Sequence, residues 1–162
     1  IKDKIVNPSE RVRRHMAIEV ILNLLIGKSS NLYKKLYEEQ ILLGEADSEY
    51  EFSNQYAHIL ISGQSNNPQL VQNMLITEIE KLKNNGFVIE DFERMKRKIY
   101  GEFVTEFNDV ASISRMFLAD TVKQINSFDY VDEYDNITME YAKELLNEVF
   151  VEDKMVLSVI KN

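Results

Sequence analysis

Two histidines, His15 and His58, are the imidazole groups of this chain, and their spacing bears on whether it could hold a catalytic metal. His15 stands four residues before Glu19, the spacing that places two side chains on one face of a helix. That pair could supply two ligands, whereas a catalytic zinc takes three from the protein. Because His15 stands in a charged first helical turn, we expect it to be a surface residue. His58 falls in a predicted strand without a partner, and we expect it to be packed or solvent-facing there.

The other residue types that could do chemistry have structural explanations. The adjacent acids Glu38 and Glu39 would point apart on a helix, and Glu90 with Asp91 stands at a helix start, where acids favour the helix dipole. The serines at 29 and 30 lack the Gly-x-Ser-x-Gly context of a nucleophilic serine. A chain with 5 glycines also offers no glycine-rich phosphate loop. The sequence therefore contains no self-sufficient catalytic constellation.

Composition predicts one folded domain over residues 1–162, because 44% of the 162 residues are hydrophobic and 10% are aromatic. The 27 acidic residues exceed the 19 basic ones, and the formal net charge of −8 argues against nucleic acid as a partner. Basic residues gather in two groups: Arg11, Arg13 and Arg14, then Arg94, Lys96, Arg97 and Lys98. We expect both groups to form solvated faces. The alternative for the first group is a contact with acids of a neighbouring domain.

Cysteine and hydropathy patterns bear on the compartment. The chain has 0 cysteines, which excludes disulfides and thiolate metal sites and fits a reducing compartment, so we expect a cytoplasmic protein. The longest apolar run, 18–26, is interrupted by Glu19 and Asn23 and is too short to cross a bilayer, so we expect no membrane partner. Because the sequence begins with Ile1 and no secretory leader, we expect it to be a fragment of a longer chain.

Periodicity predicts five or six helices and a few antiparallel strands, which is an α+β fold with the sheet packed against the helices. Helix starts are marked by Asn7-Pro8, Asn67-Pro68 and Thr138, and helix stops by Gly27 and Asn85-Gly86. In chain order we expect the tail of a strand at 1–6, a helix at 8–26, a short helix after Ser29 or Ser30, a hairpin of 46–52 with 56–62, helices at 68–85, from 90 and toward 124, an irregular stretch at 128–136, a helix after 138 and a closing strand at 154–160.

The most informative stretch, residues 27–44, reads GKSSNLYKKLYEEQILLG. Leu32 and Leu36 stand at helical spacing on one face, and the lysines and glutamates between them fall where solvent or a partner would be. This stretch resembles a motif in the C-terminal half of zinc metallopeptidases of the pitrilysin/insulinase family, the relatives of mitochondrial processing peptidase. The resemblance continues through the hairpin of 50–63, the helix after Asn67-Pro68, residues 90–96, Gly101 and the segment from Phe128 to the end. It is greatest to bacterial zinc-dependent processing peptidases.

The resemblance implies a division of labour. In this family a metal-bearing N-terminal half and a similar C-terminal half, the repeating unit of the fold, close around an unfolded peptide. The zinc-binding His-x-x-Glu-His motif is absent here, so the chain resembles the second half and zinc is expected in the N-terminal half of the intact protein. The expected partners are that half, a peptide substrate and, as an alternative assembly, a related subunit in a homo- or heterodimer.

The resemblance also implies a substrate-facing strip. Active members often carry an arginine and a tyrosine seven residues apart in this motif, and those two places fall at Tyr37 and Gly44. Neither side chain matches. We therefore expect residues 37–44, with Glu38 and Glu39, to contact peptide without supplying catalytic chemistry. The alternatives are a noncatalytic family member that scaffolds a partner, and an unrelated α+β interaction domain.

Overall fold

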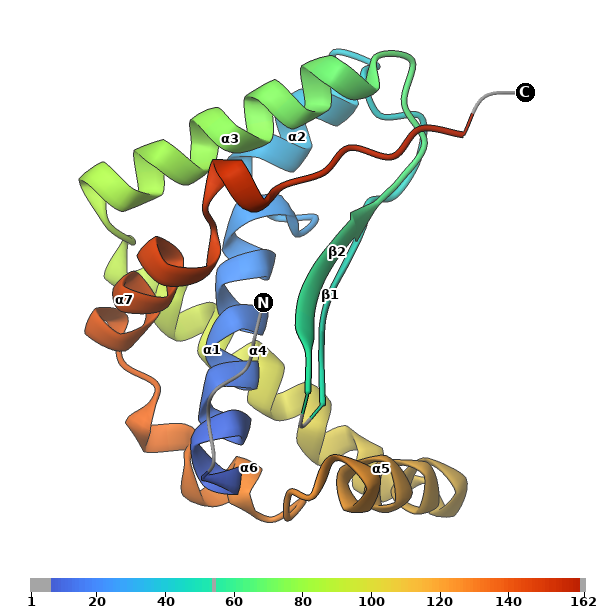
Figure 1. Ribbon diagram of the computed structural model, residues 1–162, viewed down its shortest axis with the longest axis vertical. Helices are drawn as coiled ribbons and strands as arrows, with labels where there is room; N and C mark the ends of the chain where they lie inside the picture. Colours follow the sequence, from blue (N-terminus) through green and yellow to red (C-terminus); the bar gives the residue numbers. More distant parts are fainter. Residues whose placement is uncertain (1–6, 54, 161–162) are drawn as a thin grey trace.

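The computed structural model describes residues 7–53 and 55–160, and it places a small hairpin beside a set of helices (Figure 1). The expected strand tail at 1–6 lies outside these residues. The elements in chain order are α1 (Pro8–Ile26), α2 (Asn31–Glu38), β1 (Asp47–Phe52), β2 (Ala57–Ser62), α3 (Pro68–Asn85), α4 (Ile89–Thr105), η1 (Glu106–Asn108), α5 (Val110–Lys123), α6 (Asp129–Asp132), η2 (Tyr134–Asn136), α7 (Met139–Val149) and η3 (Glu152–Lys154).

Helix α1 is the centre of the fold, and α2, α3, α4, α6, α7 and β1 all contact it. It begins as expected, because the Asn7 side chain accepts the Ser9 N–H and Pro8 occupies the first helical turn. Its buried residues include Val12, Ile18 and Leu22, each 0% exposed. The fold is therefore a helical layer around one apolar helix, with the hairpin on one side.

Gly27 ends α1 as predicted, but not in the left-handed conformation in which glycine often ends a helix. Its φ is −61°, in the ordinary region of the backbone. Glycine is required there by space, because a Cβ would lie 2.5 Å from the carbonyl oxygen of Asn23. The sequence marks the helix end correctly, but a close approach of the backbone explains the residue.

The hairpin confirms the expected antiparallel pairing, with Tyr50 opposite Ile59 and Phe52 opposite Ala57. One face packs on the helices, since Tyr50, Phe52 and Ala57 are buried. The acids Glu49 and Glu51 alternate with them and stand on the other face. This small sheet and its helical layer confirm the α+β class.

The remaining helices also follow the expected signals. The Asn67 side chain caps α3, Gly86 ends it with φ at 76°, and the Thr138 side chain caps α7. In α7 the expected inward residues are all buried: Ala142, Leu145, Leu146 and Val149. Among the described residues no helix has both the length and the apolar character that a membrane span needs.

The expected strand at 154–160 is wrong. Residues 152–154 form η3, and the chain beyond runs extended without pairing to any described residue (Figure 1). Val156 and Ile160 are almost fully exposed. The alternating apolar pattern expresses strand propensity, whereas a strand also needs a neighbour for its backbone hydrogen bonds.

The expected solvated face of α1 is wrong for two arginines, because Arg11 and Arg14 are buried. Arg14 donates to Glu148 of α7 through both terminal nitrogens, at 2.8 and 3.3 Å. Its acidic partner therefore belongs to the same chain. Arg13 lies over the ring of Tyr141.

The basic group on α4 differs from the expectation at one residue. Lys96 is buried and its Nζ lies 4.5 Å from the centre of the Tyr134 ring, because α4 packs that side on the segment around η2. Arg94, Arg97 and Lys98 are exposed as expected, and Arg94 pairs with Asp91 at the helix start.

Candidate functional site

The corner strip, residues 37–44, joins α2 to β1 and contains all the expected peptide-contacting residues. Its position is fixed by α2, which starts where the Ser30 hydroxyl accepts the Tyr33 N–H at 3.0 Å. Leu32 and Leu36 face inward, and Leu36 is 0% exposed. Both are thus the core anchors that the sequence predicted.

The turn after α2 holds the corner strip against the loop that follows β2. Gln40 has φ at 55°, and the N–H groups of Ile41 and Leu42 both donate to the Leu36 carbonyl. The Ser65 hydroxyl donates to the Ile41 carbonyl at 2.8 Å, and Leu42 forms a bridge with Ser65. The backbone of the strip is therefore fixed on both sides.

The side chains of the corner strip point largely to solvent. Tyr37 is 56% exposed and its ring stacks on that of Tyr33, with centroids 6.1 Å apart. Glu38 and Glu39 are exposed, and Glu39 lies 4.0 Å from Lys35. A Cβ on Gly44 would meet no atom within 4 Å. This arrangement offers contact area and hydrogen-bond acceptors, and it has no nucleophile or acid–base pair.

A second feature is a cavity of about 410 Å³ between α1, α4, η1, α5 and α6, which we call the inter-helix cavity. Its apolar wall consists of Met16, Ile99, Phe103, Met116 and Ala119. Helix α5, which supplies part of this lining, leads away from the body of the molecule (Figure 1). The other side chains that line the inter-helix cavity are polar: His15, Glu19, Glu106, Ser112, Arg115, Asp120, Lys123 and Tyr130.

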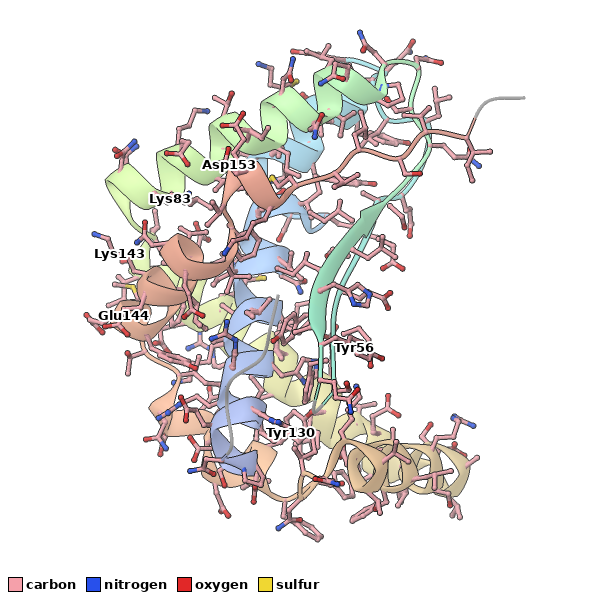
Figure 2. All side chains as sticks on the ribbon, in the orientation of Figure 1. Tyr56, Lys83, Tyr130, Lys143, Glu144 and Asp153 are labelled. Atoms are coloured by element: carbon pink, nitrogen blue, oxygen red, sulfur yellow. The ribbon has the colours of Figure 1, made fainter. Side chains whose placement is uncertain are left out.

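His15 lines this cavity, which corrects the expectation of a surface residue. Its Nδ1 lies 2.8 Å from the Tyr130 hydroxyl, and Tyr50 and Phe52 of the hairpin pack around its ring. Burial lowers the pKa of His15 to about 4, with a further contribution from the nearby Lys123. The imidazole is therefore neutral at pH 7. Figure 2 labels Tyr130 near the end of the hairpin, beside α1.

Glu19 follows one turn later on α1 and binds the backbone of β1. Its Oε1 accepts the Tyr50 N–H at 3.0 Å. Burial raises the pKa of Glu19 to about 7; the hydrogen bond from Tyr50 opposes that change, and the nearby acids Glu49, Glu102 and Asp47 add to it. In an antiparallel pair alternate N–H groups point away from the neighbouring strand, and Glu19 satisfies one of them at the outer edge of β1.

The far side of the cavity is held by two contacts at the end of α5. The buried Asp120 accepts a hydrogen bond from the Ser127 hydroxyl at 2.6 Å, and burial raises the pKa of its carboxyl. Lys123 pairs with Glu51 of β1 at 3.2 Å and lies over the Phe52 ring. Lys123 thus connects α5 to the hairpin, and Asp120 holds the turn that follows α5.

The remaining sequence candidates take structural roles. Among the described residues, no group of three or more histidines, cysteines or acids is placed to hold a metal ion. His58 is exposed on β2 and stacks with Tyr56, which confirms the solvent-facing alternative. Glu90 and Asp91 stand in the first turn of α4 as expected.

Sequence reasoning missed most of the inter-helix cavity. Asp120, Lys123 and Tyr130 come from segments that it treated as a helix and an irregular stretch. The available signal was a carboxyl group at 120 directly after the apolar run 116–119. Its proximity to His15 depends on tertiary packing across more than 100 residues, which local periodicity does not contain.

Comparison with known proteins shows a family match and a similar bacterial protein. Residues 5–99 match the family described as the peptidase M16 inactive domain. The uncharacterized zinc protease YmfH of Bacillus subtilis is 24% identical over 151 residues, covering 91% of this chain and 34% of that protein.

Two solved structures are similar in fold. The crystal structure of a putative M16-like peptidase from Alicyclobacillus acidocaldarius has a TM-score of 0.84 at 22% identity, over 91% of this chain and 36% of that one. A protease from Helicobacter pylori has a TM-score of 0.69 at 18% identity, over 86% of this chain and 35% of that one. The chain thus spans about a third of the length of these relatives. On the match over residues 5–99, it belongs to the peptidase M16 inactive-domain family.

Proposed function

We propose that this chain is the non-metal, substrate-enclosing part of a zinc-dependent M16 metallopeptidase, in which a preceding half of the longer protein holds zinc and the general base. The observation that carries the proposal is the match of residues 5–99 to the inactive domain of the family. It is supported by a relative almost three times as long, which is named a zinc protease.

The corner strip is the proposed contact with substrate. Tyr37 supplies an exposed aromatic ring, Glu38 and Glu39 supply acceptors, and Gly44 leaves the backbone accessible. An extended peptide is recognised through such contacts together with backbone hydrogen bonds. The corner strip would bind the substrate and the transition state equally well. The chemical steps would take place on the metal-bearing half.

A second candidate function is a noncatalytic subunit that binds or scaffolds a related subunit. It is favoured by Tyr37 and Gly44, which stand where active relatives of the resembled motif carry an arginine and a tyrosine. The sequence upstream of this chain distinguishes the two candidate functions, because only a catalytic parent protein needs a His-x-x-Glu-His motif there.

The experiment is cleavage of an unfolded peptide by the longer protein before and after removal of metal with a chelator. We expect cleavage that a chelator abolishes and added zinc restores. A folded longer protein that holds zinc but leaves the peptide intact contradicts the proposal. A folded protein that holds no zinc and binds a related subunit supports the scaffold function instead.

A further inference from the structure

Residues 155–160, which we call the terminal segment, have the sequence of a β-strand, but no described residue pairs with them. They read MVLSVI and contain neither a charged side chain nor a proline. Their backbone is extended from Met155 onward, where φ is −91° and ψ is 138° (Figure 1). The Met155 N–H donates to the Glu152 carbonyl at 2.9 Å, and beyond it no backbone hydrogen bond joins the segment to another described residue. Its polar backbone groups are therefore open to a neighbouring strand.

Both faces of the terminal segment are apolar. In an extended chain alternate side chains point to opposite faces, which places Met155, Leu157 and Val159 on one face and Val156 and Ile160 on the other. The first face is partly covered, since Met155 packs against the main core and Leu157 and Val159 are 38% and 44% exposed. On the second face, Val156 is 92% exposed and Ile160 is 96% exposed. A strand that is apolar on both faces is typical of the interior of a larger sheet, where both faces are covered.

The terminal segment lacks the features that protect a free strand edge. A short segment of high β-propensity without charge or proline tends to pair with other chains when it is left exposed. The outer edge of β1 shows the contrast, because the Glu19 carboxyl accepts the Tyr50 N–H there and acids alternate along the strand. The terminal segment has no acidic or basic side chain to play this role. We therefore expect it to have a permanent neighbour.

The length of the relatives favours a neighbour in the same polypeptide. This chain covers 34% to 36% of three proteins that it resembles, so about two thirds of their length lies outside it. A segment of the same polypeptide is present at high effective concentration and can stay paired. A substrate peptide would leave the apolar face uncovered between turnovers. A second copy that paired its own terminal segment would form a two-stranded ribbon, which is marginal in water and leaves its faces exposed.

We propose that, in the longer protein, the terminal segment becomes an interior strand of a larger β-sheet, and that its neighbour is an extended, apolar segment from the part of that protein outside this chain. Backbone hydrogen bonds would join the two segments, and the added chain would cover Val156 and Ile160. The inference rests on the proposed function only in taking this chain as one part of a longer protein. It does not depend on zinc or on peptide cleavage.

The first test compares hydrogen exchange of the backbone amides at 156–160 in the longer protein and in the folded 162-residue chain. Exchange should be at least about 100-fold slower in the longer protein, because a paired interior strand opens only rarely. Helix α7, whose inward face is buried, is the reference and should exchange slowly in both proteins. Equally fast exchange at 156–160 in both proteins overturns the proposal.

Two further outcomes would assign the neighbour elsewhere. Slow exchange at 156–160 in the 162-residue chain itself, increasing with protein concentration, would identify a second copy. Slow exchange in the longer protein only after an unfolded peptide is added would identify the substrate. Each of these results contradicts the proposed neighbour.

Lysine substitutions test whether the outer face is covered. Val156→Lys and Ile160→Lys should leave the thermal midpoint of the 162-residue chain unchanged, because both side chains already stand in solvent there. In the longer protein the same changes should speed exchange at 156–160 by at least about tenfold, because a charge is costly in an apolar contact. Val88→Lys, at an exposed valine just before α4, is the matched control and should leave that exchange unchanged. Unaltered exchange in both variants of the longer protein would show that this face is not covered.

Cross-linking identifies the neighbour directly. The photoreactive residue p-benzoylphenylalanine in place of Ile160 should link, in the longer protein, to an apolar segment of the same polypeptide outside this chain. Links to residues within this chain, or between two copies, would refute the proposal.

Peptide cleavage by the same preparations separates this inference from the proposed function. A longer protein that links as expected but never cleaves peptide contradicts the proposed function and supports this inference. One that cleaves peptide while the amides at 156–160 exchange fast contradicts this inference and leaves the proposed function intact.

Discussion

At the scale of single residues, Leu36 is the side chain that fixes the corner strip. It is 0% exposed, and its carbonyl accepts two backbone hydrogen bonds from the turn that follows. Leu36→Ala should lower the free energy of unfolding by roughly 2–5 kcal/mol, because it leaves a cavity in a packed site. Lys35→Ala, on the solvent side of the same turn, should change it by less than about 0.5 kcal/mol. Urea unfolding of both variants is the measurement, and equal losses would show that the inward face of α2 is assigned wrongly.

Tyr37 tests the proposed contact with peptide. It is 56% exposed and packs on Tyr33 of its own helix, so truncation should cost little stability. In the longer protein, Tyr37→Ala should raise the Michaelis constant more than it lowers turnover, as expected when binding common to ground and transition states is removed. Glu38→Ala and Glu39→Ala should act in the same direction. Lys34→Ala, exposed on the same helix, is the control, and unaltered kinetics in Tyr37→Ala would exclude this residue from the peptide contact.

Glu19 should make stability depend on pH. Its pKa is raised from 4.5 to about 7, so the folded state holds a proton that the unfolded state has lost. A raised pKa contributes stability that is fully present below the unfolded value and disappears as pH rises through the folded value. Between about pH 4.5 and pH 7, the free energy of unfolding of Glu19→Gln should therefore rise relative to that of the unaltered protein by roughly 1–3 kcal/mol. His15 has the opposite slope, but it is present in both proteins and cancels.

Chemical denaturation of the two proteins across this range measures the difference. Glu140→Gln, which changes an exposed acid on α7, should follow the unaltered protein throughout. A constant difference between Glu19→Gln and the unaltered protein would contradict the burial of this carboxyl group.

At the scale of elements, the end of α1 depends on a glycine for lack of space. A Cβ at position 27 would stand 2.5 Å from the Asn23 carbonyl oxygen, whereas one at position 44 would meet nothing within 4 Å. Gly27→Ala should lower the free energy of unfolding by roughly 1–3 kcal/mol, because backbone must shift to relieve the contact. Gly44→Ala should change it by less than about 0.5 kcal/mol. Thermal unfolding of the two variants decides this, and a neutral Gly27→Ala would show that the helix end relaxes freely.

Local elements were largely predictable from sequence because their signals are local. The caps at Asn7, Asn67 and Thr138, the hairpin pattern and the inward face of α7 each depend on residues within a few positions. The expected strand at 154–160 was wrong because pairing needs a partner that propensity does not supply. The inward positions of Arg14, His15 and Lys96 were missed because their partners come from α7, the hairpin, α6 and η2.

At the scale of the whole molecule, the question is whether this chain could hold the catalytic metal itself. The chain spans about a third of its relatives and matches the inactive domain. Its two histidines lie in different settings, one against the Tyr130 hydroxyl and one exposed on β2. A catalytic zinc site needs three protein ligands with an open position, and neither histidine belongs to a metal-ligand group among the described residues. The proposed function accordingly places the metal and the chemistry outside this chain.

The most direct test of this central claim is zinc content and peptide cleavage measured on the folded 162-residue chain after dialysis. The account predicts far less than one zinc per chain and no hydrolysis of an unfolded peptide, with or without added zinc. Glu19→Gln should give the same result, since Glu19 binds β1 in this fold rather than a metal. One tightly held zinc per chain together with hydrolysis that a chelator abolishes would contradict the account.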